Sequence, residues 1–527
     1  MRYARTGLSL LVAALLALAG TAGAAPPPPE AALDWARISA PEGTGPTDIT
    51  YAEGRFVAVG GPGAILASDD GQTWRLVHQE PSSRIPGVGA VPGYATPDLH
   101  AVAYGGGRWV AVGKPWFLVL TSADGQTWDY SYQWTGVRIN GNRELVDVAY
   151  GGGRFVAVGN DSAGPTGYII TSADGVQWSE RERFDEMTLN GVVFDGNRFL
   201  AYGAAGDGQR GAIWTSADGE AWAPVAADLP PLQSLAYQEG RFVASGRPEG
   251  DIGTTLFTSA DGTVWRRLPT QTAFWVERVT ATGGYFFALG GGLDGPSPLA
   301  FSKDGEHWMR AETPLGAQAI VSGDDKLVAT GWGSTFLTLS PCGSFLDLPA
   351  EAPACGAVRL LTDRQVIAGY PDGSFRPQGV ITRAEFAKML SVAMGWSPLP
   401  AVPPAFADTA GHWAAEMGYL QAVAAARAIA GYPDGTFRPD APVTRAELIQ
   451  MVTGAAGLAP GAPGETYADV AAVDWYGSGV GAGLEVGLIG PGASAPVWTG
   501  PSFSPDRQVT RAEAAMVLSN LVGLLVR

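Results

Sequence analysis

The sequence predicts a multidomain protein, in which an all-β domain built from repeated sheets precedes a mainly α-helical domain built from three repeats. A Ser-Ala-Asp-Gly-x-x-Trp box recurs along the first part of the chain, and Gly-rich turns between short apolar runs lie upstream of each copy. A different phrase, Gly-Tyr-Pro-Asp-Gly followed by Thr-Arg-Ala-Glu, recurs in the last part. Self-similar units of roughly 40 to 50 residues made of short strands indicate a β-propeller or a solenoid.

The box has the chemistry of a tight turn that leads into a strand. It stands at residues 122–128, 172–178, 216–222 and 259–265, with altered copies at 68–74 and 302–308. Asp and Ser side chains bond backbone N–H groups within a turn, Gly supplies a positive φ, and the Trp can pack between neighbouring sheets. We therefore expect a folding device rather than a ligand or metal site. The box resembles the Asp-box (bacterial neuraminidase repeat) of propeller proteins, but it is one residue shorter between Asp and Trp. The resemblance implies the propeller fold and only weakly implies sialidase activity.

The repeat count predicts seven blades. Six units of four expected strands begin near Asp48, His100, Val146, Gly191, Ser234 and Arg278. A seventh, at 319–340, keeps three strands and lacks the box. The segment 33–38 reads like a box Trp and its following strand, so the strand after Trp35 is predicted to complete the seventh blade beside 336–339. Such closure would leave no free sheet edge. Six blades with a separate cap is the alternative.

The C-terminal repeats predict capped helices. Each Thr-x-x-Glu is a capping box, in which the Thr side chain and the Glu three residues later bond the helix N-terminus. The pairs are Thr382 with Glu385, Thr444 with Glu447 and Thr510 with Glu513. Apolar residues recur at helical spacing behind each box. Each repeat is also expected to open with a helix, at 406–413, at 467–475 and, more loosely, at 345–347.

Residues 345 to 524 closely resemble three S-layer homology motifs, because the loop and the box occur together at fixed separation. The resemblance implies a pseudo-three-fold helical unit that binds secondary cell-wall polymer on peptidoglycan, often through pyruvylated sugars. The wall-polymer-binding residues that it implies are Arg383, Arg445, Arg511, Trp413, Asp434 and Gly435. A guanidinium at the mouth of a capped helix suits a carboxylate ligand. Repeat two, with Trp413 and Arg445, is expected to hold the intact groove, because repeat one lacks the His-Trp pair and repeat three carries the insert 491–500. Alternatively, the arginines only pair with neighbouring acids.

The chain is expected to be exported. Arg2 and Arg5 precede an apolar run at 8–18, and Ala22-Gly-Ala offers a cleavage site, which is typical of a signal peptide. No other stretch predicts a membrane span. The expected parts are a signal peptide at 1–24, a Pro-rich lead-in at 25–31, the propeller at 32–344, and S-layer homology motifs at 345–396, 397–458 and 459–527. The expected location is the cell surface or cell wall.

Composition excludes some classes of partner. The net charge of −17, without a basic stripe, argues against a nucleic-acid partner. No Cys/His cluster has metal-ligand spacing, so no metal or other cofactor is expected. The two cysteines, Cys342 and Cys355, lie at the junction of the two domains. They form either a disulfide or two free thiols.

The propeller is expected to bind a glycan or a protein rather than to catalyse. A sialidase-type site needs converging arginines. Here Arg55, Arg108, Arg154, Arg198 and Arg241 share one repeat position, which marks them as scaffold. Exposed aromatic residues in non-repeated loops make a candidate ligand patch of Trp116, Tyr130, Tyr132 and Trp134. The alternative is a wall-anchored glycoside hydrolase or lyase acting on polysaccharide at the propeller face, with Asp48, Asp147 and Glu277 as its best carboxylates.

Overall fold

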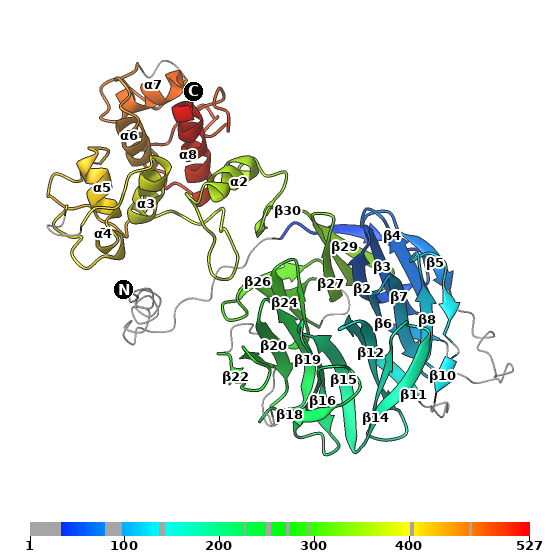
Figure 1. The fold of residues 1–527 in the computed structure, drawn as a ribbon. Helices are drawn as coiled ribbons and strands as arrows, with labels where there is room; N and C mark the ends of the chain where they lie inside the picture. Colours follow the sequence, from blue (N-terminus) through cyan, green and yellow to red (C-terminus); the bar gives the residue numbers. More distant parts are fainter. Residues whose placement is uncertain are drawn as a thin grey trace, which may run out of the picture.

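The computed structural model describes residues 33–79, 97–131, 133–135, 143–225, 228–248, 254–269, 274–291, 295–400, 405–429, 431–462 and 466–526. They form a ring of sheets followed by a helical region (Figure 1). The predicted signal peptide and Pro-rich lead-in lie outside the described residues.

The ring is a seven-bladed propeller. Among the described residues it contains six four-stranded sheets and one five-stranded sheet. Blade one comprises β2 (Gly45–Ala52), β3 (Arg55–Gly61), β4 (Ala64–Ser68) and β5 (Arg75–Gln79), and blade two comprises β6 (Asp98–Gly105), β7 (Arg108–Lys114), β8 (Leu118–Ser122) and β9 (Asp129–Tyr130). Blade three comprises β11 (Arg143–Gly151), β12 (Arg154–Asp161), β13 (Thr166–Ser172) and β14 (Gln177–Asp185), with β10 (Gln133–Thr135) added in parallel to β14.

The remaining blades keep the same order from the inside outward. Blade four comprises β15 (Met187–Phe194), β16 (Phe199–Ala205), β17 (Gly211–Ser216) and β18 (Ala223–Val225), and blade five comprises β19 (Leu232–Gln238), β20 (Arg241–Gly246), β21 (Thr255–Ser259) and β22 (Arg266–Arg267). Blade six comprises β23 (Val276–Thr282), β24 (Tyr285–Gly290), β25 (Ser297–Ser302) and β26 (Met309–Thr313). Blade seven comprises β27 (Ala317–Gly323), β28 (Lys326–Gly331), β29 (Thr335–Leu339) and β1 (Ala36–Ser39).

The N-terminal strand closes the ring as predicted. Strand β1 pairs antiparallel with β29, with Ala36 opposite Thr338 and Ser39 opposite Thr335. Trp35 is buried in one cluster with Leu337 and Leu339. The seventh blade thus joins strands from both ends of the propeller sequence.

We expect the Trp35→Ala substitution to lower the free energy of unfolding by about 3–5 kcal/mol, because it empties a large buried site at the closure. Urea unfolding followed by tryptophan fluorescence measures this change. The control is Asp34→Ala, an exposed neighbour, with an expected change within about 0.5 kcal/mol. An unchanged midpoint for Trp35→Ala would contradict the importance of the closure.

The boxes are turns, as expected. Asp124 accepts bonds from the N–H groups of Gln126 (2.8 Å) and Thr127 (2.7 Å), and Ser122 accepts from Gly125 N–H (2.8 Å). These bonds, above all that from Thr127, lower the pKa of Asp124 to about 2. The box Trp74 stacks on Phe336 of the neighbouring blade, with ring centroids 3.7 Å apart. The predicted packing of box tryptophans between blades is confirmed there.

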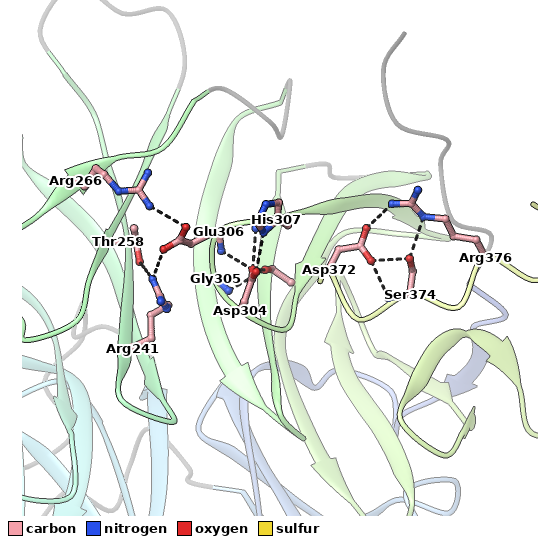
Figure 2. Close-up of polar contacts among 11 residues, drawn as sticks. Arg241, Thr258, Arg266, Asp304, Gly305, Glu306, His307, Asp372, Ser374 and Arg376 are labelled. Atoms are coloured by element: carbon pink, nitrogen blue, oxygen red, sulfur yellow. Dashed lines mark hydrogen bonds and ion pairs between the residues drawn. The ribbon is translucent and has the colours of Figure 1, made fainter. Parts of the chain in front are cut away.

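Basic residues at this repeat position tie five of the blades to the turn of another blade, which confirms the scaffold role of Arg55, Arg154, Arg198 and Arg241. The contacts join Arg55 to the Asp124 carbonyl, Arg154 to Glu220 (2.6 Å), Arg198 to the Asp261 carbonyl, Arg241 to Glu306 (2.5 Å) and Lys326 to the Asp70 carbonyl (3.2 Å). The Arg241–Glu306 pair is drawn in Figure 2. These arginines do not converge on one site.

The C-terminal region is mainly helical and has its own apolar core. Its elements are β30 (Pro341–Cys342), β31 (Phe345–Pro349), α2 (Cys355–Asp363), α3 (Arg383–Ala393), α4 (Trp413–Glu416), α5 (Tyr419–Ala425), α6 (Arg445–Ala455), α7 (Gly477–Glu485) and α8 (Arg511–Val526). The expected opening helices are wrong in their positions: 345–347 lies in β31, and 406–412 and 467–475 precede α4 and α7. The helices begin instead at Cys355, Trp413 and Gly477. Cys342 and Cys355 form a disulfide, with Cα atoms 5.6 Å apart.

All three capping boxes form. Thr382 and Glu385 cap α3, and Thr444 and Glu447 cap α6, each with reciprocal bonds. At α8, Glu513 accepts from Thr510 N–H (3.0 Å), and Thr510 Oγ1 accepts from Glu513 N–H (3.2 Å). Below, repeats one, two and three of the C-terminal sequence are called repeats A, B and C. Repeat A denotes the loop 369–376 with α3, repeat B the loop 431–438 with α6, and repeat C the segment 491–505 with α8.

Candidate functional site

The three helical repeats meet in a closed ring of backbone hydrogen bonds. Ile381 N–H donates to Val509 (3.1 Å), Val509 N–H to Val443 (3.0 Å), and Val443 N–H to Ile381 (3.1 Å). All three side chains are buried. Since each of these residues stands two positions before a repeat arginine, the ring places Arg383, Arg445 and Arg511 at equivalent points around one centre.

Each arginine reaches into the next repeat. Its guanidinium donates to a loop carbonyl there: Arg383 to Phe437 (2.8 Å), Arg445 to Phe503 (2.7 Å) and Arg511 to Phe375 (2.8 Å). It also pairs with the capping Glu of that repeat: Arg383 with Glu447 (3.1 Å), Arg445 with Glu513 (2.8 Å) and Arg511 with Glu385 (4.0 Å). The pairs form a cycle in which A contacts B, B contacts C and C contacts A.

An aromatic ring lies beside each guanidinium, and sequence reasoning did not assign these rings. The Arg383 guanidinium lies 4.8 Å from the Tyr432 ring centre, and that of Arg511 4.8 Å from Tyr370. In repeat C the insert supplies Trp498 instead, 5.1 Å from Arg445. Trp498 Nε1 also donates to Glu513 (3.1 Å). The Tyr of each Gly-Tyr-Pro-Asp-Gly loop was the available sequence signal; Trp498 had none.

The expected repeat-two groove is not assembled as predicted. Arg445 lies against repeat C, whereas Arg383 lies over Tyr432 of the loop that carries Asp434 and Gly435. The physical reason is the ring of inter-repeat bonds, which directs the first residue of each helix toward the following repeat. Asp434 instead holds its own turn, by accepting from Thr436 N–H (3.0 Å) and Arg438 (3.0 Å).

Repeat B presents an open surface. Trp413 is 40% exposed. The Asp434 side chain is 51% exposed and pairs with Arg438, and its bonds to Thr436 are the largest cause that lowers its pKa to about 2. Gly435 has nothing within 4 Å of the position that a Cβ would take. A ligand can therefore approach this loop without displacing other parts of the chain.

The same loop in repeat A is covered by the propeller. The hydroxyl of Tyr285, from β24, lies 3.0 Å from the Gly373 carbonyl oxygen and also bonds the Ser344 carbonyl. The Asp372 side chain, which pairs with Arg376 (2.8 Å), is only 6% exposed. Figure 2 shows this turn together with the box of blade six around Asp304 and His307. Repeat A is thus a docking contact between the two domains.

A cavity lies open between repeats A and C. Its volume is about 560 Å³, and its lining includes Asp347, Pro377, Arg507, Thr510 and Glu513. Arg507 is largely exposed and lies 3.9 Å from Glu513. This cavity therefore offers an accessible cation beside the third capping box.

The propeller axis holds polar side chains at equivalent register. The innermost strand of every blade carries a bulge, and the residues that follow these bulges are Asp48, Ala101, Asp147, Gly191, Ser234, Arg278 and Ala319. A cavity of about 220 Å³ is lined by Asp48, Asp147, Ser234 and Arg278, and by Tyr202 from a second strand. Tyr202 reaches it because Gly191 has no side chain: a Cβ there would lie 2.2 Å from the Tyr202 hydroxyl.

We call this cavity on the propeller axis the channel. The carboxylates that line it, those of Asp48 and Asp147, also link neighbouring blades. Asp48 accepts from Val102 N–H (3.0 Å) and lies 3.4 Å from Arg278, while Asp147 accepts from Val192 N–H (2.9 Å). Burial raises the pKa of Asp48. Burial, with a smaller effect from the charge of Asp48, raises the pKa of Asp147 to about 7 despite its backbone hydrogen bonds.

We expect the stability of the Asp147→Asn variant to increase relative to that of the natural chain as the pH rises. Asp147 has a folded pKa of about 7 against 3.8 in a model peptide, so between these values the unfolded chain releases a proton that the folded chain keeps. Ionisation therefore favours unfolding increasingly up to about pH 7, by on the order of 2–4 kcal/mol. Melting temperatures at pH 4 and pH 8 measure the difference between variant and natural chain. The control is Asp434→Asn. Because the pKa of the natural Asp434 carboxyl is lowered to about 2, the difference in melting temperature between this variant and the natural chain should be nearly the same at pH 4 and pH 8.

The predicted aromatic patch on the propeller is only partly described. Trp116, at φ 60°, lies between β7 and β8, and Tyr130 packs at the edge of a buried cluster in β9. Residue Tyr132 and the side chain of Trp134 lie outside the described residues. The patch stays a prediction. Groups of His, Cys, Asp and Glu that could hold a metal ion are absent from the residues described above.

Comparison with known proteins supports the assignment of the C-terminal part. The S-layer homology domain model matches residues 344–387 and 405–449. A cellulosome-anchoring protein of Acetivibrio thermocellus is 37% identical over 117 residues, which cover 21% of this chain and 25% of that protein. S-layer protein EA1 of Bacillus anthracis is 31% identical over 179 residues, which cover 33% of this chain and 20% of that protein. The chain thus spans a quarter or less of the length of these curated relatives.

Solved structures resemble part of this chain. A structure titled YCF48 bound to D1 peptide covers 59% of this chain and 99% of its own, with a TM-score of 0.41 and 18% identity. Virginiamycin B lyase from Staphylococcus aureus covers 58% and 99%, with a TM-score of 0.44 and 10% identity. No helix among the described residues is long and apolar enough to cross a membrane. The family match and the sheet topology together show S-layer homology domains in the C-terminal part of the chain, after a seven-bladed β-propeller.

Proposed function

We propose that this chain is an exported surface protein held non-covalently to the cell wall by its S-layer homology region, with the propeller as a binding or scaffold module for a glycan or protein. The match of two C-terminal segments to the S-layer homology model carries the proposal. The names of the relatives, which include an anchoring protein and S-layer proteins, agree with it. The polymer would be a secondary cell-wall polymer on peptidoglycan, with pyruvylated sugars as the candidate contact.

The exposed parts of repeats B and C support this proposal. Trp413 in α4 and the loop residues Asp434 and Gly435 of repeat B are open to solvent or to a ligand. The cavity between repeats A and C adds the accessible Arg507. An indole offers a stacking face to a sugar ring, and a guanidinium suits a carboxylate.

The repeat arginines have unequal access to such a ligand. Arg383 and Arg445 have side chains 5% and 6% exposed and short ion pairs, whereas Arg511 is 10% exposed and lies 4.0 Å from Glu385. Arg511 is the least buried of the three, but it reaches into repeat A, whose loop the propeller covers. Arg383 and Arg445 would act mainly by holding the repeats together.

Sedimentation with purified cell walls tests the anchoring role. The full chain is expected to sediment with intact walls and to stay in solution with walls from which the secondary polymer has been extracted by acid. Trp413→Ala should reduce the bound fraction, whereas Val264→Ala, an exposed change on the propeller, should not. Equal sedimentation with both wall preparations would refute polymer recognition.

The enzymatic alternative is a wall-anchored glycosidase or lyase. The channel cavity favours it, because Asp48 and Asp147 face a polar cavity together with Tyr202, and a carboxyl with a pKa near 7 suits a general acid. Hydrolysis of wall polysaccharides by the natural chain, lost in Asp147→Asn, would establish it. Absence of turnover with the same substrates would leave the binding role.

A further inference from the structure

The mouth of the propeller channel forms a second, larger cavity. It has a volume of about 310 Å³, and Arg278 lines both this cavity and the inner one. Its lining combines residues at the strand bulges with residues from neighbouring strands and loops: Thr47, Asp98, His100, Glu277, Gln318 and Trp332. Together the two cavities have room for a ligand larger than a few water molecules.

Trp332 gives this mouth an apolar face. Its side chain is 42% exposed, the highest value for a Trp among the described propeller residues. The backbone that carries it is fixed, because Trp332 N–H donates to the Gly316 carbonyl (3.0 Å). Burial of an indole on folding is favourable, so an indole left half-exposed beside a polar cavity is a candidate contact surface.

Two carboxylates lie around Trp332, those of Glu277 and Asp98. Glu277 is exposed, and its carboxylate occupies space that Gly291 leaves open. Asp98 lies 3.7 Å from Lys114 and 3.9 Å from His100. Deeper in the channel, Asp48 and Asp147 face the single guanidinium of Arg278. At the mouth the carboxylates of Glu277 and Asp98 are matched by the cations of Arg278 and Lys114, and the exposed Glu277 is a carboxylate open to a hydroxyl or ammonium group of a ligand.

We propose that the channel mouth binds a short glycan of neutral or amino sugars. Trp332 stacks on the apolar face of one sugar ring, while Glu277 and Asp98 accept hydrogen bonds from hydroxyl or ammonium groups. His100 Nδ1 donates to the Leu145 carbonyl (2.9 Å), which leaves Nε2 toward Asp98 and the cavity.

This inference names the ligand class of the binding module in the proposed function and rests on it. Isothermal titration of the full chain with two disaccharides tests it: chitobiose, which carries two amines, and its di-N-acetylated form. Both are expected to bind, the amine form more tightly. Trp332→Ala should weaken both about tenfold, and Glu277→Gln should weaken mainly the amine form, about fivefold.

The control is Trp475→Ala, which removes an exposed indole in the C-terminal region and should leave both affinities unchanged. No saturable binding of either sugar, or natural affinity in Trp332→Ala, would overturn the inference. Wall sedimentation of the same Trp332→Ala protein separates the two proposals. It should remain as in the natural chain, and its loss would point to a defect in anchoring instead.

Discussion

Replacing Arg445 with alanine is expected to lower the free energy of unfolding of the C-terminal region by about 3–5 kcal/mol. The Arg445 side chain is 6% exposed, pairs with Glu513 at 2.8 Å and donates to the Phe503 carbonyl at 2.7 Å. Without the Arg445 side chain, the Glu513 carboxylate keeps a hydrogen bond from Trp498 and a long contact with the exposed Arg507. The charge of Glu513 is then poorly compensated. Chemical denaturation followed by far-UV circular dichroism measures the change in the helical transition.

The same experiment separates a structural from a ligand-binding role. Arg438→Ala removes a cation that is 52% exposed, so its effect on stability should stay within about 0.5 kcal/mol. If Arg445→Ala were as stable as Arg438→Ala and yet failed to sediment with walls, Arg445 would be a polymer ligand rather than a link between repeats. Loss of both stability and sedimentation would assign it to the link.

Gly373→Ala is expected to separate the propeller from repeat A. Gly373 has a φ of 85°, and a Cβ there would lie 2.3 Å from the Tyr285 ring. The substitution therefore combines backbone strain of roughly 1–2 kcal/mol with a clash that the docked arrangement cannot absorb. We expect a larger radius of gyration by small-angle X-ray scattering and faster proteolysis between the two domains.

Gly435→Ala is the matched control. Gly435 occupies the equivalent turn of repeat B with a φ of 77°, but nothing lies within 4 Å of its would-be Cβ. It shares the backbone strain and lacks the clash, so its radius of gyration should equal that of the natural chain. Equal behaviour of the two variants would mean that the Tyr285 contact does not hold the domains together. Tyr285→Phe, which removes only the hydroxyl, should give an intermediate result.

The sequence predicted those parts of the structure that depend on local chemistry. The box turns and the capping boxes each need only a few adjacent residues, and both are confirmed. The closing strand after Trp35 pairs with a distant strand, and it could be predicted because the last repeat lacked its fourth strand. The repeated arginines could be assigned to the scaffold because a property shared by several blades cannot define a single site.

The rest depends on contacts between distant segments. Which repeat each C-terminal arginine faces follows from the backbone ring of Ile381, Val443 and Val509, which no single repeat encodes. Trp498 takes the place of a tyrosine although its surrounding sequence differs, and the Tyr285–Gly373 contact occurs once and has no periodicity. The channel mouth likewise gathers Trp332, Asp98 and Glu277 from three blades.

Closure of the ring by β1 has a mechanical consequence for a tethered protein. A pull on the C-terminal region would enter the propeller where the chain leaves β29, and β29 is held on one side by β28 and on the other by β1. Force therefore acts on a strand that has a neighbour on each side. Pulling β29 out of the sheet requires its hydrogen bonds to both β28 and β1 to break at once. Shear flow at a cell surface would thus load the ring at a reinforced seam instead of at an open edge.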